Sequence, residues 1–107
     1  MENLELVSFQ IISSVGMAKS SYIEAIQEAK KGNFEKAKTC MNEGKNSFSQ
    51  AHNVHAELIQ SETSGEGINP TLLLLHAEDQ MMSAETCKIL AEELIENYER
   101  ITALEKR

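Results

Sequence analysis

The residues best suited to chemistry are a histidine and an aspartate near the start of the last third of the chain. His76 and Asp79 are three residues apart and follow the aliphatic run Leu72–Leu75. On a helix, residues three apart share one face, with their Cβ atoms roughly 5 to 6 Å from each other. An unprotonated imidazole nitrogen can accept a phosphoryl group near neutral pH, and apolar surroundings protect the new bond from water. The segment could therefore hold a phosphoryl acceptor, and a hydrogen-bonded structural histidine is the alternative that residue types leave open.

Asp79 stands out for a second reason, because it interrupts an apolar register. Leu72, Leu75 and Met82 recur around it at helical spacing, which predicts an apolar residue at position 79. A buried carboxylate needs a charged partner or a metal ion. If this helix lined a threefold axis, three copies of Asp79 would meet there and would require a cation or shared protons. The alternative is a carboxylate at the solvated edge of a helix.

Three long helices are expected to position these residues, over residues 3–31, 33–64 and 70–106. Apolar residues recur at helical spacing through each range, and only two segments interrupt them. At the first interruption, Gly32 follows two lysines and ends a helix, and Asn33 is expected to cap the next one. At the second, Asn69 is expected as the N-cap of the third helix and Pro70 as its first residue.

Length and composition indicate a single all-α domain that associates with copies of itself. A chain of 107 residues has room for one hydrophobic core. Helices of roughly 40 to 55 Å are far longer than the average of globular proteins, and a three-helix bundle of that length covers its apolar faces poorly. We therefore expect one domain over residues 1–107, built of three long antiparallel helices, and self-association.

The net charge and the two cysteines limit the classes of function that this sequence fits. A net charge of −7 without a basic stripe argues against nucleic acid as a partner. The acidic N-terminus and the lack of a long apolar run predict a cytoplasmic protein that does not enter the membrane. Cys40 and Cys87 lie in helical patterns without metal-ligand spacing, so reduced, buried thiols are expected.

The run from His76 to Met82 resembles the His-x-Gln-Asp-His-Leu-Met signature of the lactose/cellobiose enzyme IIA family of the bacterial sugar phosphotransferase system. The segments Gly16–Ser20, Gly32–Ala37 and Ala51–Ile59 resemble other characteristic segments of that family, in the same order and at matching separations. Ser64–Glu66 fits as well, so the resemblance covers nearly the whole chain. No single motif is specific, but the ordered set is.

The resemblance implies a homotrimer packed as a nine-helix bundle. It also implies a phosphocarrier that takes a phosphoryl group from the histidine-containing phosphocarrier protein and passes it to a cysteine of enzyme IIB. The phosphorylated position of the family falls on His76. Asp79 matches the aspartate that meets its symmetry mates around one divalent cation per trimer, for which magnesium is expected. The transported sugar would be a β-linked disaccharide such as cellobiose, chitobiose or lactose, and the membrane is reached only through enzyme IIC.

The sequence departs from the family signature beside the expected acceptor. Glu78 stands where the family usually has glutamine, and Gln80 stands where it usually has a second histidine. Glu78 adds negative charge near the phosphoryl group, which should oppose phosphorylation or alter the choice of partner. Gln80 can still form hydrogen bonds but carries no charge. His55 also replaces a glutamine of the family, and a packed histidine is expected there in preference to a metal pair with His52.

Two other function classes compete with the phosphocarrier. The long amphipathic pattern would suit a non-catalytic helical-bundle adaptor that binds a partner helix, although this leaves His76 and Asp79 unexplained. A bundle metal protein could use the three histidines and nearby carboxylates, but the repeated Glu-x-x-His pairs of ferritin-like sites are missing from the sequence. The ratio of metal ions to chains would separate this second class from a trimer.

Overall fold

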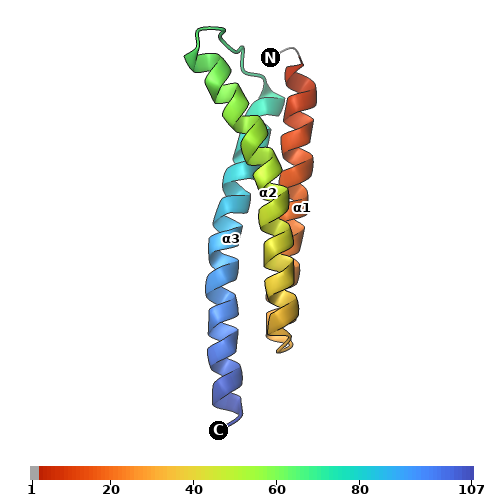
Figure 1. Ribbon diagram of the computed structural model, residues 1–107, viewed down its shortest axis with the longest axis vertical. Coiled ribbons are helices and arrows are strands. Elements are labelled where there is room, and N and C mark those ends of the chain that lie inside the picture. The colour runs from red at the N-terminus through yellow and green to blue at the C-terminus, as the bar shows by residue number, and fades with distance from the viewer. Residues whose placement is uncertain (1–2) are drawn as a thin grey trace.

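The computed structural model describes residues 3–107, which form three antiparallel helices joined by two connections (Figure 1). Helix α1 spans Leu4–Lys30, α2 spans Phe34–Thr63 and α3 spans Leu72–Glu105. The bundle is elongated, with extents of 61 × 19 × 19 Å. Residues 3–107 contain no strand, so the expected all-α class with three long helices is confirmed.

Helix α1 is the central element of the bundle. It packs against both α2 and α3, whereas α2 and α3 touch each other at few points. Its apolar residues recur at spacings of three and four, so they form one face that two neighbours can cover. The apolar side chains buried on this face follow the helical spacing expected over residues 3–31: Val7, Ile11, Val15, Ala18, Tyr22, Ala25 and Ala29.

The connection between α1 and α2 is held by a buried carboxylate. Gly32 has a φ of 86°, a left-handed conformation that ends α1 and that glycine adopts without steric cost. Asn33 is the N-cap of α2, as expected, but its side chain forms no capping hydrogen bond and its Nδ2 instead donates to Oε1 of Glu28 at 3.0 Å. Nζ of Lys36 lies 3.6 Å from the same carboxylate. The Asn33 hydrogen bond, followed by the nearby lysines, lowers the pKa of Glu28 despite its burial.

The third helix begins two residues later than expected. Asn69 and Pro70 belong to the connection, and Thr71 is the N-cap. The backbone of Thr71 is extended, and its hydroxyl accepts a hydrogen bond from the backbone N of Leu74 at 3.1 Å. The threonine hydroxyl satisfies a free N–H group of the first turn, the role expected of the Asn69 side chain. Thr71 therefore sets the start of the helix that carries His76.

Helix α3 has two apolar faces. The face that packs on α1 is built largely from small residues, among them Ala77, Ala84 and Ala91, which are fully buried. The apolar register that the sequence revealed lies on other sides of the helix, with side chains between 39% and 83% exposed: Leu72, Leu75, Met82, Ile89, Leu94, Ile101 and Leu104. Within one chain this second set of apolar side chains has no cover.

The remaining sequence expectations concern the membrane and the cysteines. Over residues 3–107, no helix combines the length and the apolar character that a membrane crossing demands. Cys40 is buried between α1 and α2, Cys87 is half-buried on α3, and both are free thiols. Burial raises the pKa of Cys40, which keeps its thiol protonated and unreactive.

Candidate functional site

His76 lies in the second turn of α3 and is exposed to solvent. Its neighbours Leu74 and Ala77 are buried against the rest of the bundle, which fixes the rotation of this part of the helix. The imidazole is therefore presented on a rigid element rather than on a loop. An exposed ring on a fixed backbone suits transfer between proteins, because each partner can reach it.

Asp79 is exposed one turn further along α3, on the side of the helix that His76 also occupies. It lines a groove of about 580 Å³ between α1 and α3, whose walls include Met82, Leu90 and Leu94. No group of three or more metal-ligating side chains occurs among residues 3–107. One carboxylate is too few ligands for a divalent cation, so a metal at Asp79 requires ligands from other chains.

A lysine from α1 reaches the same groove. Nζ of Lys19 donates to Oγ of Ser83 at 3.1 Å, and both residues line the groove together with Asp79. Lys19 lies in one of the segments that carry the family resemblance, but the sequence pattern did not single it out. A signal for Lys19 was present in the sequence, because this charged residue directly follows Ala18, which lies on the buried face of α1.

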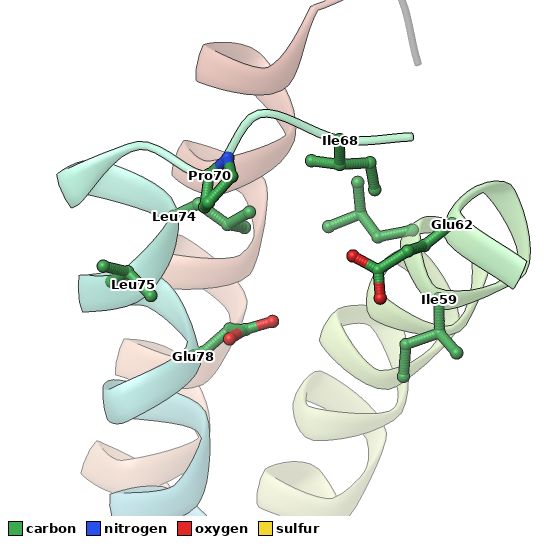
Figure 2. Close-up of a pocket in the computed structure, with 8 residues that line it drawn as sticks. Ile59, Glu62, Ile68, Pro70, Leu74, Leu75 and Glu78 are labelled. Carbon is green, nitrogen blue, oxygen red and sulfur yellow. The ribbon is translucent and has the colours of Figure 1, made fainter. Parts of the chain in front are cut away.

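Glu78 faces away from this groove, toward α2. Residues two apart on a helix lie roughly 200° from each other around its axis, so Glu78 and His76 occupy different sides of α3. Oε1 of Glu78 lies 2.9 Å from Nε2 of His55 on α2. Figure 2 shows the Glu78 carboxylate pointing from α3 toward α2. The structure thus pairs two residues that the sequence analysis had considered separately.

A cavity of about 200 Å³ lies beside Glu78, between the end of α2, the connecting segment and the start of α3. Figure 2 shows the side chains around it. They are mostly apolar, with Glu62 as the second carboxylate: Leu58, Ile59, Glu62, Ile68, Pro70, Leu74, Leu75 and Glu78. Near the candidate acceptor, the side of α3 that faces α2 thus borders a mostly apolar cavity, whereas the side that carries His76 is exposed to solvent.

The other residues singled out from the sequence do not gather around His76. Gln80 is half-buried on α3, and His52 is exposed on α2 beside a separate cavity of about 240 Å³. The side chain of His55 is 23% exposed and is bonded to Glu78. The packed histidine expected at position 55 therefore has a carboxylate partner, and a metal pair with His52 has no further ligands among residues 3–107.

Comparison with known proteins places this geometry in a family. The profile described as "PTS system, Lactose/Cellobiose specific IIA subunit" matches residues 6–99. A lichenan-specific phosphotransferase enzyme IIA component of Bacillus subtilis is 45% identical over 94% of this chain and 92% of its own length. A lactose-specific EIIA component of Staphylococcus aureus is 32% identical over 92% of this chain and 96% of its own. The crystal structure of the cellobiose-specific enzyme IIA of Bacillus anthracis superposes with a TM-score of 0.92, at 41% identity, covering 96% of this chain and 94% of that one.

Proposed function

Since the chain belongs to the lactose/cellobiose-specific IIA family of the phosphotransferase system, and is thus a phosphate-carrying component of that system, we propose that His76 carries the phosphoryl group. The observation that supports this assignment is the exposed imidazole on the rigid second turn of α3, at the position where the sequence matches the family signature. The family membership also decides between the phosphocarrier and the adaptor or bundle metal protein considered above.

The proposed reaction is two successive transfers through one side chain. The lone pair of an unprotonated ring nitrogen of His76 attacks the phosphorus of the phosphorylated histidine on the histidine-containing phosphocarrier protein, and the donor P–N bond breaks. A cysteine of enzyme IIB then takes the phosphoryl group from His76. In-line placement and charge stabilisation are the main requirements of such transfers, so the partners can supply the donors that this exposed site lacks. This exchange would take place in the cytoplasm.

We further propose that the protein works as a homotrimer, assembled through the exposed apolar side of α3. The side chains of Leu72, Leu75, Met82 and Ile89 form an apolar stripe that one chain leaves uncovered. Contiguous exposed apolar surface on a protein marks an interaction site. A second copy of α3 is the occupant that fits, because Asp79 lies in the register of this stripe and its copies would then meet at a shared axis.

Asp79 is proposed as the ligand of one divalent cation per trimer, for which magnesium is the expected ion. Three carboxylates brought to one axis repel each other unless a cation or protons offset their charge. Hard cations such as Mg²⁺ prefer carboxylate oxygens and keep several water ligands, which suits a site with few protein ligands. The cation would offset the repulsion between the three carboxylates and supply no step of phosphoryl transfer.

The sugar of the system is proposed to be a β-linked disaccharide such as cellobiose, with chitobiose and lactose as alternatives. The relatives named for lichenan and cellobiose are 45% and 41% identical to this chain, whereas the lactose-specific relative is 32% identical. These identities support cellobiose over lactose. Growth on each disaccharide after deletion of the gene would test the assignment.

The experiment that tests the carrier function is phosphorylation in a reconstituted system. The protein is incubated with phosphoenolpyruvate and the general phosphotransferase proteins, and its intact mass is measured. We expect one phosphoryl group per chain, stable in base and lost in acid, as phosphohistidine chemistry requires. A protein that takes up no label, or whose label survives acid, would contradict the proposal.

A further inference from the structure

The His55–Glu78 pair is a polar bridge between two helices that otherwise touch little. Nε2 of His55 on α2 lies 2.9 Å from Oε1 of Glu78 on α3, and the two side chains are 23% and 44% exposed. Lys45 and Glu92 form a second bridge between the same helices, with Nζ 3.7 Å from Oε2. Fourteen residues separate Glu78 from Glu92, or about 21 Å along α3 at 1.5 Å per residue. The His55–Glu78 bridge is therefore close to His76 along α3, and the Lys45–Glu92 bridge is far from it.

Only the first bridge lies within the field of the proposed phosphoryl group. A phosphoryl group carries about 1.5 to 2 negative charges near neutral pH, and Glu78 is two residues from His76. Asp79 adds a carboxylate on α3, and Glu62 lines the cavity beside Glu78. Helix α1 adds Glu5 near its start and Lys19, whose Nζ donates to Oγ of Ser83 in the groove that Asp79 lines. Lys19 thus lies on the Asp79 side of α3, and His55 is the basic side chain in contact with Glu78.

Building on the proposed carrier function, we propose that His55 is a positioning residue that acts through Glu78. Its ring, 2.9 Å from the carboxylate, holds Glu78 on the α2 side of α3. In this way a glutamate is accommodated two residues from a phosphorylated histidine. Loss of this contact releases the negatively charged carboxylate, which then opposes the arrival of a phosphoryl group on His76.

A cycle of four proteins tests the inference: the wild type, His55→Ala, Glu78→Gln and the double variant. The phosphorylated fraction at equilibrium with the phosphorylated donor protein is measured by intact mass at one fixed pH and at low ionic strength. His55→Ala should lower the phosphorylation equilibrium roughly two- to fourfold, the size expected when one negative charge lies about 10 Å from a phosphoryl group in water. Glu78→Gln should phosphorylate at least as well as the wild type, and the double variant should match Glu78→Gln because it has no carboxylate to release.

The remote bridge supplies the matched control. Lys45→Gln removes a cation from the same pair of helices and leaves Glu92 uncompensated, but it should not change the phosphorylation equilibrium. If His55→Ala and the double variant are impaired equally, His55 has only a structural role and the inference fails. It also fails if His55→Ala is phosphorylated as well as the wild type. These outcomes differ from failure of the carrier function, in which none of the four proteins would take up label.

Discussion

Gly44 on α2 packs directly against the aromatic ring of Tyr22 on α1. A Cβ atom at position 44 would lie within 2.7 Å of Cδ1 of the tyrosine, and Tyr22 is completely buried. The glycine thus makes room for the largest fully buried side chain of the bundle. This contact sets how closely α1 and α2 approach each other at this level of the bundle.

Replacement of Gly44 by alanine should destabilise the bundle by about 1 to 3 kcal/mol, because the added methyl group overpacks the core. The free energy of unfolding is measured in urea at one fixed protomer concentration. Gly16→Ala on α1 is the control, since a Cβ there meets no atom within 4 Å. The control should gain about 0.5 to 1 kcal/mol from helix propensity. Equal midpoints for Gly44→Ala and the wild type would show that the ring moves aside freely.

Acid stability should depend on Glu28. Its pKa is lowered by the Asn33 hydrogen bond and by Lys31 and Lys36. A carboxylate with a lowered pKa contributes stability above its ordinary pKa and loses this contribution as the pH falls through the lowered value. Unfolding of the wild type at pH 7 and at pH 3 should therefore differ more than unfolding of Glu28→Gln. Replacement of the exposed Glu66 by glutamine is the control, and an acid response that is the same in all three proteins would argue against a stabilising role of the cluster.

Much of the fold could be predicted because the apolar residues of one helix face recur at regular spacing in the sequence. The apolar spacing of α1 predicted its buried residues, and Gly32 predicted the first turn. The pattern of α3 was harder to interpret, since its packed face consists of alanines such as Ala77 and Ala84, which contribute little to a hydrophobic pattern. The larger side chains Leu72 and Leu75 dominated the pattern, although they lie outside the core of the single chain.

The candidate site was predictable only in part. His76 and Asp79 could be found because they are three residues apart on one helix. The pairing of His55 with Glu78 could not, because these residues lie 23 positions apart on different helices and no local spacing relates them. The start of α3 was placed at Pro70 because proline favours the first helical position. The hydroxyl of Thr71 caps the helix instead.

The exposed apolar stripe of α3 should be the surface through which chains associate. Ile89→Glu places a charge on this stripe and should convert a trimer to monomers, because burial of an unpaired carboxylate is costly. The mass in solution is measured by light scattering. Ile59→Glu on α2 is the matched control, since the two isoleucines are 56% and 51% exposed. The control should stay trimeric, and a trimeric Ile89→Glu would exclude this part of α3 from the interface.

Replacement of Asp79 by leucine should leave the trimer intact or strengthen it, because an apolar residue then completes the register of the stripe. The same change should remove the bound cation. Metal content after dialysis against magnesium should be one ion per three wild-type chains and none in Asp79→Leu. Collapse of the variant to monomers would argue against a buried axial position for Asp79.

The most direct measurement of the central claim is the identity of the histidine that carries the phosphoryl group. His52, His55 and His76 are the three histidines of the chain, so a set of single replacements covers every imidazole. Each variant is incubated with phosphoenolpyruvate and the general phosphotransferase proteins, and the acid-labile mass increase is recorded. His76→Ala should remain folded and take up no label, whereas His52→Asn and His55→Gln should still be labelled. Label that survives His76→Ala would show that a different residue is the carrier.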